Sequence, residues 1–256
     1  MLISTNAVYG SSLENGEGVV GTVRDLFFND QSWAVRYLVV ETGNWLSGRR
    51  VLLPPSMVEQ KDWPDRRLWV ALTQQQIKDS PDVDTDKPVS RQEQLELEQC
   101  CVWGAPMGGF ALPVPAQPGA EGDADAESDS HLRSAKQVTG YRIQASDGEI
   151  GHVEELILDD EGYLHGLWEF RYLVVDTANW LPAKKVLISP AWTKSISWDE
   201  KKVRLAASRE MVKDSPEFDP KAPVNRRYEE ALCDYYGQPK YWLAHGATTV
   251  EAEAGK

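Results

Sequence analysis

Cysteine and positive charge are both scarce in this chain of 256 residues. Three cysteines cannot build a disulfide framework, which favours a reducing compartment, and we expect a cytoplasmic protein. The 27 lysine and arginine residues are outnumbered by 40 aspartate and glutamate residues, so the net charge is −13. This balance argues against nucleic-acid binding and against docking on an anionic membrane surface, because both depend on cations that meet phosphates.

Long hydrophobic runs are also missing. The longest resemble Tyr37–Val40, far short of the ~20 apolar residues that span a bilayer, so no transmembrane segment is expected. The stretch Met1–Asn6 has no basic region followed by an apolar core, which argues against a signal peptide. We therefore expect a soluble, acidic protein.

An internal duplication is the most informative feature that is present. The stretch Arg36–Leu46 recurs as Arg171–Leu181, 135 positions later, and the same register continues to the end of each copy. Upstream the offset is 130, as between Gly21 and Gly151, and the difference corresponds to an insertion around Gly162 in the second copy. A run of matches this long in one register indicates two copies of one structural unit.

The segment between the copies differs from both in composition. It is rich in proline, glycine, alanine and acidic residues and has no lysine or arginine, so it cannot bury enough apolar surface to fold. The predicted divisions are a first repeat at 1–105, a flexible acidic linker at 106–131, a second repeat at 132–245 and a flexible tail at 246–256.

Each copy has the pattern of a small β-fold. In Gly21–Phe28 and Gly151–Leu158 the residue types alternate with period two, which is typical of strands. Trp33–Val40 is apolar on both faces, as in a central strand. Short strands at spacings of about 8–15 residues, with glycine between them and no long helix, predict a closed barrel. The predicted fold is therefore mainly β, with two tandem small β-barrels joined by the linker.

A short helix is expected at the end of each barrel. In the first copy a capping box at Ser90 opens a helix that runs to about Cys101, and in the second copy Asn225 takes the cap position. An apolar stripe follows Asn225 at helical spacing. We expect it to face the chain's own barrel, and a partner protein is the alternative. The stripe consists of Tyr228, Ala231, Leu232, Tyr235 and Tyr236.

These patterns resemble a known family. Three features are similar to the PRC-barrel domain. They are the signature Trp33-x-Val-Arg-Tyr-Leu-Val-Val-Glu-Thr-Gly-x-Trp-Leu46, its repeat over Trp168–Leu181 and the continuations through Pro55 and Pro190. The resemblance implies a compact all-β barrel. It also implies kinship with the cytoplasmic part of the photosynthetic reaction-centre H subunit and with the C-terminal domain of a ribosome maturation factor. In those settings the domain binds or stabilises a larger assembly and is not an enzyme. The membrane helix of the first and the RNA-associated domain of the second have no counterpart in this sequence.

The repeated aromatic and arginine residues are the first candidates for a site. We interpret the aromatic residues as core, because large rings dominate the interior of small domains. The two arginines lie inside apolar strands, so each is expected to pair with a carboxylate, for which Asp25 or Glu41 is a candidate. The repeated set is Trp33, Arg36, Tyr37, Trp45, Trp168, Arg171, Tyr172 and Trp180.

No catalytic, cofactor or metal site is expected from the remaining polar residues. None of the four histidines (His131, His152, His165, His245) recurs at the matching position, and their spacing does not fit zinc. The cysteines Cys100, Cys101 and Cys233 fall on the expected helices, where packing is the favoured interpretation over a redox pair. The alternating acids Asp123, Asp125, Glu127 and Asp129 lack the glycine and glutamate of a calcium loop and are interpreted as solvated linker.

Two functions from different classes follow. The first is a non-catalytic protein-binding or scaffold module that stabilises or assembles a larger complex, either photosynthetic or stress-related. It would bind a protein partner or self-associate, and peripheral association with a membrane complex is compatible with it. Its candidate interface, between the barrels or with the partner, is Tyr235, Tyr236, Tyr241 and Trp242. The alternative is an enzyme or small-molecule-binding protein with a site in the cleft between the barrels, where His152, His165 and Lys184-Lys185 would be the residues to inspect.

Overall fold

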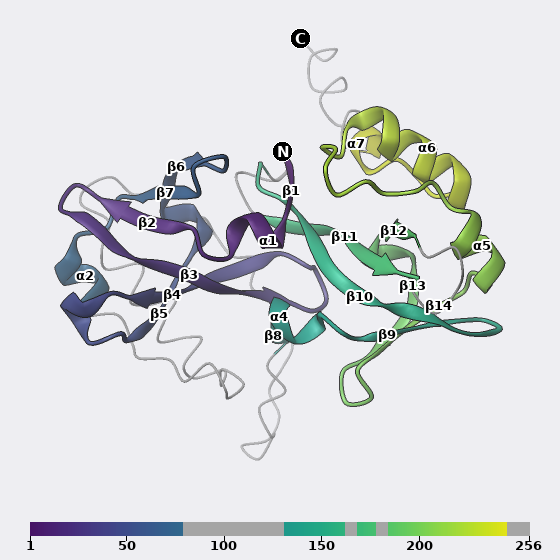
Figure 1. Cartoon of the computed structure of the whole chain (residues 1–256), viewed down its shortest axis with the longest axis horizontal. Coiled ribbons are helices and arrows are strands. Elements are labelled where there is room, and N and C mark those ends of the chain that lie inside the picture. The colour runs from purple at the N-terminus through teal and green to yellow at the C-terminus, as the bar shows by residue number, and fades with distance from the viewer. Residues whose placement is uncertain (79–130, 162–167, 178–183, 245–256) are drawn as a thin grey trace, which may run out of the picture.

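Two β-sheets make up most of the chain that the computed structural model describes, which covers residues 1–78, 131–161, 168–177 and 184–244 (Figure 1). Each sheet has seven strands, and the helices are short. The mainly β class is therefore confirmed. The helix expected at Ser90–Cys101 and the predicted linker lie outside the described residues.

The first repeat contributes seven strands and four short helices. Their bounds are β1 Leu2–Ser4, α1 Thr5–Val8, β2 Ser12–Asn15, β3 Gly18–Asn29, β4 Val35–Thr42, η1 Asn44–Leu46, β5 Arg50–Leu53, η2 Pro55–Met57, β6 Val58–Asp62, β7 Arg67–Val70 and α2 Gln74–Lys78.

Within the described residues the second repeat has the same order of strands as the first, and it ends in three helices. Its elements are β8 Leu132–Ser134, α4 Ala135–Val138, β9 Arg142–Ala145, β10 Gly148–Asp159, β11 Glu169–Asp176, β12 Lys185–Ile188, η3 Pro190–Trp192, β13 Thr193–Ser197, β14 Lys202–Leu205, α5 Arg209–Asp214, α6 Arg226–Tyr236 and α7 Tyr241–Ala244.

The two sheets have the same topology. One runs β5-β4-β3-β2-β7-β6 and the other β12-β11-β10-β9-β14-β13. Only β2 with β7 and β9 with β14 are parallel among these neighbours. Among the described strands no ladder joins the two ends of either sheet, so the closed barrels expected from the sequence are not seen as hydrogen-bonded barrels.

Gly21 and Gly151 stand at equivalent places where the long strands pass close to a neighbour. A Cβ atom on Gly21 would lie 2.6 Å from the carbonyl oxygen of Glu41, and one on Gly151 would lie 1.9 Å from that of Asp176. Only a residue without a side chain fits at such a separation. The repetition of these glycines in the sequence thus has a steric cause.

Two β-bulges shape each long hairpin. Between β3 and β4, Phe27 pairs with Tyr37 and Phe28 with Val35, so Arg36 is the extra residue. The same shift between β10 and β11 leaves Arg171 as the extra residue. A bulge bends its strand and redirects the extra side chain. This explains why an arginine can lie within an otherwise apolar strand.

The sheets exchange their first strands. β1, at the start of the first repeat, pairs with β10 of the second, and β8, at the start of the second, pairs with β3 of the first. In Figure 1 the purple β1 lies along the teal β10, and the teal β8 and α4 lie beneath the purple β3. The predicted repeat boundaries do not indicate this exchange. Because of the exchange, each sheet contains strands from both repeats.

One continuous hydrophobic core runs through both repeats. Its centre is an aromatic seam, which we define as Phe28, Trp33, Trp63, Trp168, Phe170 and Trp198. Phe28 stacks on Trp33 with ring centroids 4.8 Å apart and meets Phe170 edge-on at 5.3 Å. The strand backbones also meet here, because Val35 N donates to the Trp168 carbonyl at 2.8 Å and Phe170 N donates to the Trp33 carbonyl at 2.9 Å.

Candidate functional site

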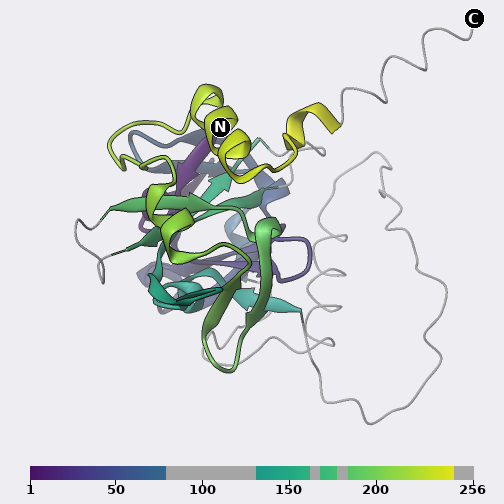
Figure 2. The ribbon, with the colours of Figure 1, turned by 90° about the vertical axis from the view of Figure 1, so that its right-hand side faces the viewer.

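The C-terminal helices cover the outer face of the second sheet (Figure 2). The Asn225 side chain accepts a hydrogen bond from Tyr228 N at 3.0 Å, which starts α6 as expected, and Gly237 ends it in the left-handed conformation with φ 62°. Leu232 of α6 is fully buried in a cluster with Tyr172 and Val174 of β11. Tyr228, Leu232 and Tyr236 of the stripe therefore face the chain's own sheet, whereas Ala231 and Tyr235 are exposed.

A buried glutamate lies at the centre of the contact between α6, α7 and β11. Glu229 is only 2% exposed. Its Oε1 accepts hydrogen bonds from the hydroxyls of Tyr172 and Tyr241, each at 2.9 Å, and its Oε2 lies 3.0 Å from Arg226. The side chain thus joins the two C-terminal helices to the sheet.

Burial dominates the electrostatics of this group. It raises the pKa of Glu229 above its usual value, and this effect outweighs the hydrogen bonds from the tyrosines and the attraction of Arg226. Burial likewise raises the pKa of Tyr241 to about 12, helped by the charge of Glu229. The pKa of Tyr172 is raised as well, again first by burial and then by Glu229. Both hydroxyls therefore remain donors at neutral pH.

Arg171 is the second charged group at this position. The bulge directs it to the outer face, where its side chain is 14% exposed. It lies 3.4 Å from Asp159 and 2.8 Å from Glu169, and its guanidinium stands 4.2 Å from the centre of the Tyr241 ring. The expected carboxylate partner is present, although it is neither Asp25 nor Glu41.

The other predicted arginine behaves differently. Arg36 is exposed, so the prediction that it is buried within its strand was wrong, because the bulge turns it outward. Glu41 pairs with Arg24, and Asp25 accepts a hydrogen bond from Ser134.

The predicted tail aromatics occupy three different environments. Tyr236 packs on Trp192 with ring centroids 5.4 Å apart, and Tyr235 is 36% exposed, with its hydroxyl donating to the Met211 carbonyl at 2.8 Å. Tyr241 covers Glu229, and Trp242 stacks under Arg226 at 4.2 Å. None of these four belongs to the aromatic seam that joins the sheets.

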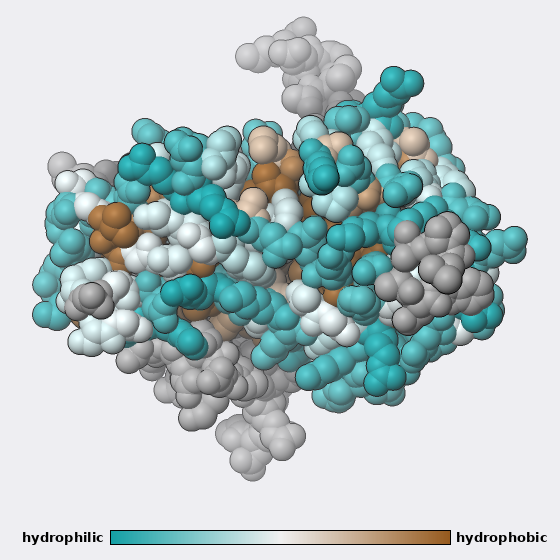
Figure 3. Space-filling view, viewed as in Figure 1, coloured by the Kyte–Doolittle hydropathy of each residue, from teal (hydrophilic) through white to brown (hydrophobic). Residues whose placement is uncertain are grey.

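A cavity of about 480 Å³ opens beside Tyr241. It lies between the C-terminal helices and the exchanged strand β1, and Figure 3 shows hydrophobic residues at the surface next to this N-terminal strand. Both apolar and charged side chains line it. The lining residues are Met1, Leu2, Asp159, Glu161, Val224, Arg226, Glu229 and Tyr241.

Most of the repeated aromatic residues lie in the interior. Trp33, Trp168, Tyr37 and Tyr172 are all buried. Trp45 is partly buried against the core and donates from Nε1 to the Val20 carbonyl at 2.8 Å. Trp180 lies outside the described residues.

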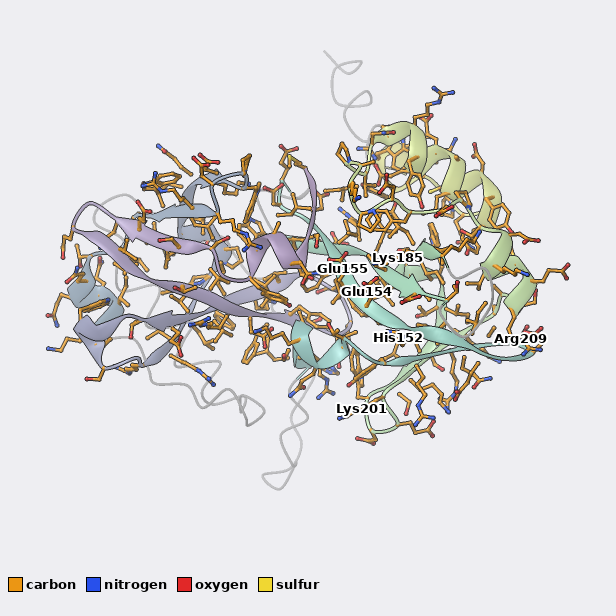
Figure 4. All side chains as sticks on the ribbon, viewed as in Figure 1. His152, Glu154, Glu155, Lys185, Lys201 and Arg209 are labelled. Atoms are coloured by element: carbon orange, nitrogen blue, oxygen red, sulfur yellow. The ribbon has the colours of Figure 1, made fainter. Side chains whose placement is uncertain are left out.

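Two of the residues named for an enzyme site, Lys184 and Lys185, have structural partners. Lys184 donates to the Ser215 carbonyl at 2.6 Å, and Lys185 lies 2.7 Å from Glu154, a contact that Figure 4 shows on the face of the second sheet. His152 lies further along β10 in the same view, away from this pair. His165 and His245 fall outside the described residues.

Histidine, cysteine, aspartate and glutamate side chains are the candidate metal ligands among the described residues. In those ranges no three histidine, cysteine, aspartate or glutamate side chains are grouped to hold an ion. Cys233 is free and buried on α6, where burial raises the pKa of its thiol. Cys100, Cys101 and the acids at 123–129 lie outside the described residues.

Sequence reasoning missed an equivalent pair of buried polar contacts between the repeats. Asp25, which is 8% exposed, accepts a hydrogen bond from Ser134 Oγ at 2.5 Å, and Glu155, which is 6% exposed, accepts one from Ser4 Oγ. Both carboxylates and both serines are related by the offset of 130. That coincidence was a usable signal, because a repeated acid inside an apolar strand needs a repeated partner.

Comparison with known proteins agrees with the signature. The family model of the PRC-barrel domain matches residues 9–71, which confirms the resemblance expected for the first repeat. No curated protein matches the chain. In the part of the chain that the structure describes, none of the helices has the length and apolar character to cross a membrane.

Proposed function

We propose that this chain, with a PRC-barrel domain match over residues 9–71 and a second copy of the same pattern, is a non-catalytic docking module that helps to assemble a larger protein complex. In this proposal each repeat is a barrel-type module, and the partner binds at the C-terminal helices. We define the docking surface as Arg226, Tyr241, Trp242 and Leu243.

The observation that carries the proposal is the Arg226–Trp242 stack at the surface. The Arg226 side chain is 51% exposed, with its guanidinium 4.2 Å from the Trp242 ring. The next residue, Leu243, is 64% exposed. Arginine, tryptophan and tyrosine are the residue types that contribute most binding energy at protein interfaces, and an exposed leucine beside them adds apolar area.

The docking surface rests on a fixed support. The hydroxyl of Tyr241 donates a hydrogen bond to Glu229, and the guanidinium of Arg171 packs on the tyrosine ring. Side chains that are already ordered lose little conformational entropy when a partner binds, which favours affinity. The neighbouring cavity gives space for a side chain of the partner.

The wider setting is proposed from the family. Kinship with the cytoplasmic part of the reaction-centre H subunit supports a place at the periphery of a membrane-protein assembly, photosynthetic or stress-related, on the cytoplasmic side. Because the chain carries a net charge of −13, direct attraction to anionic lipid is unfavourable, and the partner is a protein.

A matched pair of tryptophan variants tests the proposal. Trp242→Ala removes the stack at the docking surface, whereas Trp69→Ala removes an arginine–tryptophan stack at an unrelated place in the first repeat, where Arg67 lies 5.2 Å from the ring. Both variants and the unchanged chain are purified from the native cells with isotope-labelled quantification of bound proteins. We expect Trp242→Ala to lose a partner by about tenfold or more and Trp69→Ala to retain it. Equal recovery by both variants, with unchanged melting temperatures, would refute the proposal.

A second candidate function has one observation in its favour. A cavity of about 360 Å³ lies at the boundary of the repeats, beside Trp33 and Trp198. In it, His131 Nδ1 lies 2.9 Å from Asp30, and Arg133 lies 2.9 Å from the same carboxylate. This arrangement fits a small polar ligand. A thermal-shift screen of metabolites, repeated with His131→Ala, tests it: a stabilising compound must lose its effect in the variant.

A further inference from the structure

The contact between the repeats has the properties of a dimer interface. It is reciprocal: Leu2 of the first repeat pairs with Asp159 of the second, and Leu132 of the second pairs with Asn29 of the first. In an isologous interface each partner offers the same patch, so every contact occurs twice. The two strand exchanges follow this rule although both partners lie on one chain.

One pair of buried polar contacts, those of Asp25 and Glu155, follows the same rule. Asp25 accepts hydrogen bonds from Ser134 Oγ and, at 3.2 Å, from Lys136 N. At the equivalent place Glu155 accepts hydrogen bonds from Ser4 Oγ and, at 2.8 Å, from the Asn6 side chain. Each repeat thus supplies donors for a buried acid of the other. Figure 4 shows Glu155 beside α1, the helix that carries Asn6.

The aromatic seam supplies the apolar part of the contact. Phe28 and Phe170 come from different repeats, as do Trp63 and Trp168, whose centroids are 5.7 Å apart. All four rings are buried. A repeat on its own would expose them together with an unpaired edge of its long strand, and both are unfavourable in water.

We infer that the surface between the repeats is a recognition surface for a second repeat of the same kind, and that the association does not need the covalent connection. The recognised features are a short N-terminal strand that ends in serine, a buried acid on the long strand and the aromatic rings of the seam. This chain is therefore a dimer of repeats carried on a single polypeptide. The inference is independent of the proposed docking surface, which lies on α6 and α7.

Cleavage of the full chain tests the inference. A protease recognition sequence is inserted into the predicted linker, outside the described residues, and the purified protein is cut to completion. Size-exclusion chromatography and native mass spectrometry then report whether the fragments remain together. We expect a single 1:1 particle. Two fragments that separate while each retains its β-sheet circular dichroism would overturn the inference.

A pair of serine variants tests the geometry in the cleaved protein. Ser134→Asp places a carboxylate against the buried Asp25, whereas Ser195→Asp adds the same charge at an exposed position of β13. We expect Ser134→Asp to raise the dissociation constant of the fragments on the order of 100-fold, because an unpaired buried charge is costly, and Ser195→Asp to leave it within about threefold. Before cleavage the connection keeps the local concentration high, so Ser134→Asp remains assembled. Equal dissociation constants for the two cleaved variants would contradict the proposed surface.

Discussion

Adding one methyl group at Gly151 should destabilise the protein more than any conservative surface change. The new Cβ atom would lie 1.9 Å from the Asp176 carbonyl oxygen and 2.9 Å from the carbonyl carbon. Both are backbone atoms of the neighbouring strand, so no side-chain rotation relieves the clash. Overpacking typically costs about 1–3 kcal/mol, and we expect Gly151→Ala to lie at about 3 kcal/mol. For a chain of this size that corresponds to a fall of about 6–12 °C in melting temperature.

Two other glycines complete the series. At Gly21 the new Cβ atom would lie 2.6 Å from the Glu41 backbone oxygen and 2.7 Å from Val40 Cγ1, so the overlap with backbone is smaller than at Gly151 and we expect about 2 kcal/mol. At Gly16 nothing lies within 4 Å, and Gly16→Ala should change stability by less than about 0.5 kcal/mol. Urea unfolding at equilibrium measures all three, with the slope m checked for constancy. If Gly151→Ala and Gly16→Ala unfold at the same urea concentration, the strands do not approach each other closely at Gly151 and the prediction fails.

Three further predictions concern the core and the C-terminal cluster. Phe28→Ala should lower the free energy of unfolding, measured in urea, by about 3–5 kcal/mol. Val19→Ala, at a site 59% exposed, should change it little. Similar losses of stability in the two variants would place Phe28 outside the core. Because burial raises the pKa of Glu229 in the folded state, its contribution to stability is greatest below about pH 4.3 and is lost as the pH rises through the folded pKa. Glu229→Gln should flatten that part of the pH–stability curve, and an unchanged curve would argue against the shift. Arg171→Lys should cost about 1 kcal/mol, because the planar contact with Tyr241 is lost; a neutral result in thermal unfolding would show that charge alone suffices there.

The features with a local cause could be predicted from the sequence. Alternation identified β3 and β10, the apolar run identified β4 as a central strand, and Asn225 identified the start of α6. In each case the signal lies within about ten residues, where strand periodicity or a cap leaves a direct pattern. The family signature rests on the same segments and was confirmed over residues 9–71.

The features with a distant cause could not be predicted in this way. β1 and β8 have only three residues each, too few for a periodic pattern, and their partners are known only once the chain is folded. The bulge that turns Arg36 outward depends on the register between two strands, which the sequence of one strand does not contain. The cluster at Glu229 joins residues of α6, α7 and β11, so none of its members stands out alone.

The strand exchange also sets the order in which the molecule can be completed during synthesis. Ser4 and Glu155, which meet in the folded protein, are 151 positions apart. The first sheet gains its seventh strand only after residue 134 has left the ribosome, and until then the edge of β3 that β8 covers stays open. When several ribosomes translate one messenger RNA, neighbouring nascent chains present the same open edge of β3 and the same strand β8. Pairing in trans would therefore compete with correct folding, and it should rise with translation rate and with crowding of ribosomes.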